Sequence, residues 1–167
     1  MRKLHRLQDK WRDIVFGSIA LLVVIADQLS KAWIRANLTP GQVLVDKGFL
    51  QIIHVQNTGA SFGIFKDHTL IIIVAVFIEI ILILFIVYLF RNRLSFIDSM
   101  LMRTGAGLII GGAIGNQIDR IRLGRVTDFI DFKFWPAFNV ADASAVVGVI
   151  IVVYCIIFLS DFIKHRE

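Results

Sequence analysis

TLIIIVAVFIEIILILFIVYLF, residues 69–90, is an apolar run in which Glu79 is the only charged side chain. A helix of about 20 such residues crosses a hydrocarbon core about 30 Å thick and satisfies its own backbone hydrogen bonds. Hydrophobic residues make up 57% of the chain, more than a soluble core of this size can use. The run therefore predicts a membrane-spanning helix and indicates a membrane protein.

Three further apolar runs of similar length predict three more spans. Together, the four predicted spans are Ile14 to Trp33, Thr69 to Phe90, Met100 to Ile118 and Ala143 to Phe162. No internal repeat, low-complexity tract or linker divides the chain, so residues 1–167 are predicted to form one domain. The expected fold class is membrane α-helical with four transmembrane helices. An even number of spans places both termini on the same side of the membrane.

Lysine and arginine cluster beside the apolar runs and form no basic stripe with interleaved aromatic residues, so the net charge of +5 does not indicate nucleic acid. The clusters lie in the N-terminal segment, in a loop with Arg91 and Arg93, and in the C-terminal KHRE. By the positive-inside rule, these regions face the cytoplasm. The basic residues that then lie outside are Arg120, Arg122, Arg125 and Lys133.

Two segments, roughly Ala36 to His68 and Asp119 to Ala141, lie outside the membrane in this topology. The first contains β-branched residues in partial alternation, interrupted at residues 47–48 and 57–59 by turn-forming residues. Such a pattern predicts short strands, and we expect a small β-sheet on the outer face. The aromatic run FKFWPAF, residues 132–138, predicts an interfacial loop or helix.

The third predicted span contains a series of glycines, and polar residues follow them at its end. Gly107, Gly111 and Gly115 recur at four-residue spacing, which presents a smooth face for close helix packing. Asn116 and Arg120 follow, one helical turn apart, and could hold a carbonyl group or a lipid phosphate. The alternative is a plain helix end whose polar residues mark the membrane boundary.

Three ionisable residues lie within predicted spans, where an unpaired charge costs at least about 2.5 kcal/mol. Asp27 and Lys31 are four residues apart on one helical face and can pair. The pair can be a self-neutralising structural feature or a support beneath a catalytic site. Glu79 must find a partner or be protonated, and a structural hydrogen bond to another span is the simpler explanation.

Carboxylates concentrate after the third span, at Asp128 and Asp131 in GRVTDFIDF and at Asp142 in FNVADA. Two carboxyl groups held close together share a proton near neutral pH, so the pair can supply both an acid and a base for peptide hydrolysis. Sequence spacing does not show whether Asp128 and Asp142 meet. Capping of the following helix is the alternative role for Asp142.

Other chemistries have weaker signals. The sequence has no Ser, His and Asp set in a recognisable order and no His or Cys pair at metal-ligand spacing. Two further hypotheses remain open at this point. One is a transporter or proton-conducting bundle that uses Asp27, Lys31 and Glu79. The other is a metal-dependent lipid enzyme, whose oxygen ligands would be Asp119, Asp128, Asp131 and Asp142.

Five motifs, in order along nearly the whole chain, resemble those of the lipoprotein signal peptidases, or signal peptidase II, the intramembrane aspartic endopeptidases of bacteria. Each motif alone is a weak signal, whereas five in order are specific. The motifs are DQLSK at 27–31, NTGASFG at 57–63, GGAIGNQIDR at 111–120, VTDF at 126–129 and FNVADA at 138–143.

The resemblance implies a catalytic pair formed by Asp128 and Asp142, with no metal and no cofactor. Asp128 is chosen over Asp131 because it occupies the V-x-D-F position. The other residues at motif positions, which would bind substrate or support the site, are Asn57, Asn116, Arg120, Asn139, Asp27 and Lys31.

Each supporting residue has an expected role under this resemblance. Arg120 and Asn116 would hold the substrate backbone or the lipid head group, and Asn57 would bind extended peptide. Asn139 would orient Asp142. Asp27 and Lys31 would fix the first span beneath the site.

The resemblance also implies a substrate and a location. The substrate is a prolipoprotein whose cysteine carries a diacylglyceryl group, and cleavage falls just before that cysteine. The enzyme would be a monomer in the phospholipid bilayer of the bacterial cytoplasmic (inner) membrane. Both termini would be cytoplasmic and the active site would lie near the outer face.

Overall fold

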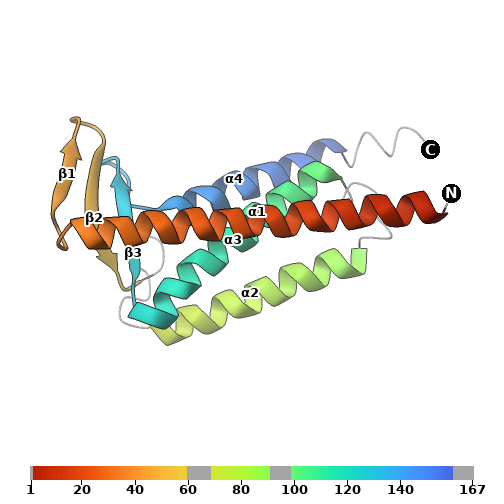
Figure 1. Cartoon of the computed structure of the whole chain (residues 1–167), viewed down its shortest axis with the longest axis horizontal. Helices are drawn as coiled ribbons and strands as arrows, with labels where there is room; N and C mark the ends of the chain where they lie inside the picture. Colours follow the sequence, from red (N-terminus) through yellow and green to blue (C-terminus); the bar gives the residue numbers. More distant parts are fainter. Residues whose placement is uncertain (1, 60–68, 91–98, 160–167) are drawn as a thin grey trace.

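The computed structural model describes residues 2–59, 69–90 and 99–159. Its four α-helices are α1 (Arg2–Asn37), α2 (Thr69–Phe90), α3 (Met100–Leu123) and α4 (Val140–Tyr154). A π-helical turn, η2 (Cys155–Leu159), continues α4. The helices run side by side, and the start of α1 and the end of α4 lie at the end of the molecule opposite the sheet (Figure 1).

Several predicted features lie outside the described residues. They are Arg91 and Arg93, the C-terminal KHRE, residues 60–63 of NTGASFG and residues 160–162 of the fourth predicted span. Glu79 lies in α2, and its side chain also falls outside the described part of the chain. The predicted role of Glu79 therefore stays a prediction.

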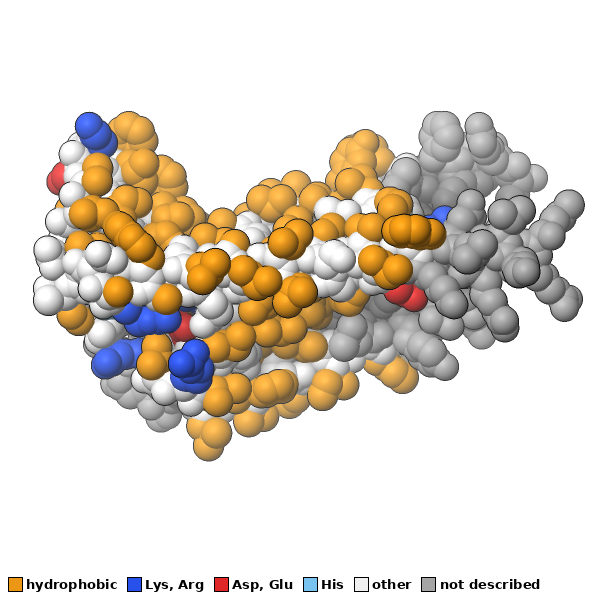
Figure 2. Space-filling model, viewed as in Figure 1, with side chains coloured by type: hydrophobic (Ala, Val, Ile, Leu, Met, Phe, Trp, Pro, Cys, Tyr) orange, Lys and Arg blue, Asp and Glu red, His pale blue; other side chains and the backbone are white. Residues whose placement is uncertain are grey.

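All four predicted helices are present in the described residues; α2 has the predicted bounds, and the other three have shifted ends. Both α1 and α3 extend beyond the predicted spans, and α4 begins at Val140 instead of Ala143. Among the described residues, two helical stretches are long and apolar enough to cross a membrane, Trp11–Asn37 and Val140–Phe158. Figure 2 shows hydrophobic side chains spread along the outside of the helices and basic side chains gathered near the sheet.

Three antiparallel strands, β1 (Val43–Asp46), β2 (Gln51–Asn57) and β3 (Val126–Asp131), form a sheet in the order β1-β2-β3. The predicted turn at Lys47-Gly48 joins β1 to β2, and Gly48 has a φ of 81°, which favours glycine. The predicted small sheet is therefore confirmed. Strand β3 was not predicted, because the predicted strands lay in the first outer segment and no secondary structure was assigned to residues 126–131.

An apolar cluster attaches the sheet to the helices. Ile34 and Leu38 at the end of α1 pack against Phe129 of β3, and Val140 at the start of α4 adds to the contact. Phe129 and Asp128 are neighbours in β3, whose successive side chains point to opposite faces. Packing of Phe129 on this cluster therefore helps to direct Asp128 away from it.

The glycine face of α3 packs against α1, as predicted. A Cβ atom added to Gly107 or Gly111 would lie 2.9 Å from the carbonyl oxygen of Phe16 or 2.7 Å from that of Ala20, respectively. The opposite side of α3 packs against α4, where Gly105 and Gly148 approach each other. Close contact on both sides makes α3 the central helix of this three-helix group.

Gly111→Ala tests this packing. The added methyl group meets the Ala20 backbone, and we expect a loss of about 1–3 kcal/mol in the free energy of unfolding. Gly17→Ala in α1 is the matched control, because nothing lies within 4 Å of its added Cβ. Thermal unfolding in detergent should show a lower midpoint for Gly111→Ala only. Equal midpoints for the two variants would contradict the close packing.

Candidate active site

Asp128 and Asp142 come together where the sheet meets the helices. Asp128 lies in β3 with 2% of its surface exposed, and Asp142 lies in the first turn of α4. Asn139 connects them, since its Nδ2 donates to Asp128 Oδ1 at 2.7 Å and its Oδ1 accepts from the Asp142 backbone N–H at 3.0 Å. The tertiary structure thus joins two carboxylates whose proximity the sequence left undecided.

The start of α4 positions Asp142 through a capping box. Asn139 is the N-cap, and its own backbone N–H donates to Asp142 Oδ2 at 3.1 Å. The reciprocal bonds satisfy backbone donors that a helix start leaves unpaired. Asp142 therefore does cap the helix, as the alternative prediction held, and its Oδ1 remains available to accept from Asn116 Nδ2 at 2.8 Å.

Asn57 at the end of β2 also contacts the pair. Pairing of β2 with β3 sets Val55 opposite Asp128, and Asn57 Nδ2 donates to Asp128 Oδ2 at 3.0 Å. Asn57 Oδ1 accepts from the Gly59 backbone N–H at 2.9 Å. The role expected for Asn57 was peptide binding, whereas in the structure its amide holds a carboxylate.

Burial and charge alter the acidity of Asp128. Burial is the main cause, and the nearby Asp142 charge adds to it, so the pKa of Asp128 is raised from 3.8 to about 7. Hydrogen bonds from Asn57 and Asn139 oppose this rise. An Asp with such a pKa can hold a proton near neutral pH.

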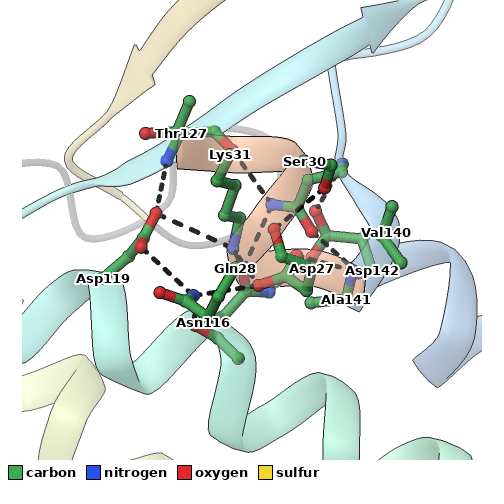
Figure 3. A network of polar contacts seen from close by, with 12 residues as sticks. Asp27, Gln28, Ser30, Lys31, Asn116, Asp119, Thr127, Val140, Ala141 and Asp142 are labelled. Atoms are coloured by element: carbon green, nitrogen blue, oxygen red, sulfur yellow. Dashed lines mark hydrogen bonds and ion pairs between the residues drawn. The ribbon is translucent and has the colours of Figure 1, made fainter. Parts of the chain in front are cut away.

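A buried ionic network lies beneath the carboxylates (Figure 3). Lys31 Nζ lies 2.8 Å from Asp27 Oδ2, and both side chains are completely buried, so the predicted pair is confirmed. Lys31 Nζ also donates to Asn116 Oδ1 at 2.8 Å. Asp27 Oδ1 in turn accepts from the Ala141 backbone N–H at 3.0 Å, which ties α1 to the start of α4.

Asp119 is a supporting residue that sequence reasoning considered only as a possible metal ligand. Its side chain is 1% exposed and lies 3.7 Å from Lys31 Nζ and 3.3 Å from Arg35 Nη1. Asp119 Oδ2 accepts from the Thr127 backbone N–H, one residue before Asp128. Its place in GNQIDR, three residues after Asn116, was the available signal, since both then lie on one helical face.

A cleft with a volume of about 1090 Å³ opens beside the carboxylates. Arg120 lines it and lies close enough to Asp128 and Asp142 to interact electrostatically. The lining residues from the sheet, the β3–α4 loop and α4 include Asn57, Phe132, Trp135, Phe138, Val146 and Val147. The site therefore has polar groups at one place on an otherwise largely apolar wall.

Asp131 does not belong to this cluster. Its Oδ1 accepts from the Lys133 backbone N–H at 2.7 Å, and it is absent from the described lining of the cleft. The described residues contain no group of three or more His, Cys, Asp or Glu placed to hold a metal ion. The four carboxylates considered as a metal site are thus engaged in different contacts.

Comparison with known proteins adds an independent finding. The family model described as signal peptidase (SPase) II matches residues 19–158, most of the chain. This chain belongs to the signal peptidase II family. Membership assigns it to the proteases that process lipoproteins, and the family is membrane-bound. Membership of this family supports the cleavage of lipoprotein signal peptides as the activity of the chain.

Individual relatives agree with the family. A lipoprotein signal peptidase of Dehalococcoides mccartyi is 48% identical over 139 residues, covering 83% of this chain and 86% of that protein. One from Caldanaerobacter subterraneus is 45% identical, covering 84% and 94%. A bacterial membrane enzyme solved by the in meso method at 2.3 Å resolution superposes with a TM-score of 0.70 at 34% identity, covering 83% and 84%.

Lys31→Met tests the buried network. Removing the ammonium leaves Asp27 buried without its cation, and we expect a loss of about 3–5 kcal/mol in the free energy of unfolding. Lys133→Met is the matched control, because its ion pair with Asp46 is solvent-exposed and should contribute little. Thermal unfolding of both variants in detergent measures the difference. Similar small losses in both would contradict the structural role of Lys31.

Stability should also depend on pH through Asp128. The folded protein keeps a proton on this group up to about pH 7, whereas the unfolded chain loses it near pH 4, so this stabilising contribution falls as pH rises between these values. Asp128→Asn removes the dependence. Thermal unfolding measures the effect. The difference in unfolding midpoint, Asp128→Asn minus wild type, should therefore grow from pH 4 to 7 and then level off. A difference that does not change with pH would contradict the raised pKa.

Proposed function

We propose that this member of the signal peptidase II family is an aspartic endopeptidase in which Asp128 and Asp142 activate water. The observation that carries the proposal is the bridge through Asn139, which holds a strand carboxylate and a helix carboxylate together beside a cleft. The raised pKa of Asp128 supports a pair that is singly protonated near neutral pH.

The reaction follows from one ionised and one protonated carboxyl group. The ionised group takes a proton from water, and the water oxygen bonds to the scissile carbonyl carbon. The protonated group donates its proton to the carbonyl oxygen. When the tetrahedral intermediate breaks its C–N bond, a proton passes to the leaving amine, and the pair returns to its starting protonation state.

The proposed substrate is a prolipoprotein with a diacylglyceryl-modified cysteine, cleaved just before that cysteine. The apolar part of the cleft, which includes Val146, Val147 and Trp135, suits acyl chains or an apolar signal peptide. Arg120 is the proposed contact for a substrate carbonyl or the lipid head group, since it is a cation beside the carboxylates. Asn57, Asn116 and Asn139 are proposed to hold the catalytic carboxylates.

The proposed topology has four spans in the bacterial cytoplasmic membrane, a single domain and a monomeric enzyme. Support comes from the sheet, which lies at one end of the helices, and from the start of α1, basic in sequence, which lies at the other (Figure 1). The cleft is lined in part by residues of that sheet. The positive-inside rule then places the N-terminus in the cytoplasm and the site near the outer face.

Asp128→Asn and Asp142→Asn should each abolish turnover. Neither amide can exchange protons as the reaction requires, while the similar shape should preserve the fold. Asp131→Asn is the matched control and should keep most of the wild-type activity, because Asp131 lies outside the cleft. The measurement is cleavage of a diacylglyceryl-modified lipobox peptide by purified protein in detergent, with excess chelator present.

Each alternative has a distinct result in this assay. Retention of more than a few per cent of the activity by both variants would overturn the aspartate pair. Loss of wild-type activity in chelator would favour a metal-dependent reaction. Thermal unfolding of each variant separates loss of chemistry from loss of fold.

A further inference from the structure

Lys31 helps to determine how the Asn116 amide is oriented, and Asn139 Nδ2, which also donates to Asn116 Oδ1 at 3.1 Å, supports the same orientation. The Lys31 ammonium, paired with Asp27, offers only hydrogen-bond donors, so the Asn116 atom 2.8 Å from it must be the carbonyl oxygen. The opposite amide atom, Nδ2, therefore faces Asp142 and donates to its Oδ1 at 2.8 Å. A buried cation thus contributes to the direction of a hydrogen-bond chain that ends on the proposed catalytic carboxylate of Asp142.

Backbone N–H groups orient the other two amides in the same way. The Asp142 N–H donates to Asn139 Oδ1, so Asn139 Nδ2 faces Asp128. The Gly59 N–H donates to Asn57 Oδ1, so Asn57 Nδ2 also faces Asp128. None of the three amides can turn over without placing two donors or two acceptors against each other.

All four carboxyl oxygens consequently accept a hydrogen bond from a fixed donor. Asp128 accepts from Asn139 and Asn57, and Asp142 accepts from Asn116 and the Asn139 backbone. A proton on either carboxyl group cannot be donated to these neighbours. Such a proton must sit on a lone pair that no neighbouring donor occupies. Because both side chains line the cleft, the proton is then directed toward the partner carboxyl group or the substrate.

The two carboxyl groups nevertheless differ in their surroundings. Asp142 lies in the first turn of α4, where the helix dipole and a backbone N–H favour a negative charge. Asp128 lies in a buried strand with 2% of its surface exposed, and burial raises its pKa. Arg120 in α3 is a cation that interacts with both carboxyl groups, and the Lys31 charge opposes the raised pKa of Asp128 without cancelling it. The difference in surroundings therefore favours an ionised Asp142 and a protonated Asp128.

We propose that Lys31 is a positioning residue that acts through Asn116 to keep Asp142 ionised, so that Asp142 is the initial base and Asp128 the initial acid. The inference rests on the proposed function and assigns the two roles that the aspartate pair leaves open. Lys31 reaches neither the substrate nor the reacting atoms, because its side chain is fully buried.

In the assigned reaction, each carboxyl group ends the cycle in the protonation state in which it began. Asp142 takes a proton from water as the water oxygen bonds to the carbonyl carbon, and Asp128 gives its proton to the carbonyl oxygen. When the C–N bond breaks, Asp142 passes its proton to the amine. The new carbonyl bond forms as the hydroxyl returns a proton to Asp128. Water is consumed, and the products are a carboxyl group and an amine.

The pH profile of kcat/KM tests the assignment, with the modified lipobox peptide as substrate. Asn116→Ala removes a donor to Asp142 and should move the acid limb to higher pH by roughly one unit. Asn57→Ala removes a donor to Asp128 and should move the alkaline limb upward by a similar amount. Asn37→Ala is the matched control and should move neither limb, because the exposed Asn37 amide donates to the Trp33 carbonyl in its own helix.

Lys31 is tested by two variants in the same assay. Lys31→Met lacks a donor for Asn116 and should move the acid limb upward, whereas Lys31→Gln retains a donor and should move it less. Equal shifts would show that Lys31 acts through charge alone and would overturn its positioning role. If Lys31→Met does not fold, Asn116→Ala is added to Lys31→Gln. The proposal then requires the acid limb of the double variant to lie at higher pH than that of Lys31→Gln alone.

Failure of this inference differs from failure of the proposed function. An active enzyme in which Asn116→Ala moves the alkaline limb and Asn57→Ala the acid limb would reverse the assigned roles. Unchanged limbs in both variants would also overturn the inference. In either case the aspartate pair is retained if Asp128→Asn and Asp142→Asn are inactive.

Discussion

The geometry of the candidate site depends first on the contacts of the buried Lys31 ammonium group. This group contacts acceptors from two helices, Asp27 in its own helix and Asn116 and Asp119 in α3. A cation without solvent is stable only when such partners surround it, so the two helices cannot separate here without exposing unpaired charges. The same contacts reach Asp142 through Asn116, which links helix packing directly to the orientation of a proposed catalytic group.

Close packing of α3 makes this network possible. Its glycines allow α1 and α4 to approach on opposite sides, and an added Cβ at Gly115 would lie 2.7 Å from Asp27 Oδ2. The small residue therefore leaves the space that the buried carboxylate occupies. Packing and polar contacts support each other at this level, because Asp27 also accepts from the Ala141 backbone at the start of α4.

The sheet completes the site from the other side. Pairing of β2 with β3 brings Asn57 to Asp128, and the packing of Phe129 on α1 turns Asp128 toward the cleft. One carboxylate thus comes from a sheet and the other from a helix start. The different origins supply different environments, which is how two identical side chains can take the separate acid and base roles of a hydrolytic mechanism.

Sequence patterns were sufficient to predict the apolar helices, the hairpin, the glycine packing face and the Asp27–Lys31 pair, because each depends on local composition or on spacing along one element. The resemblance to signal peptidase II named Asp128 and Asp142. The folded structure was needed to find that Asn139 joins them, that Asn57 donates to Asp128 and that Asp119 accepts from the β3 backbone. These contacts join distant segments, and β3 itself depends on pairing with β2, so local sequence patterns carry little information about them.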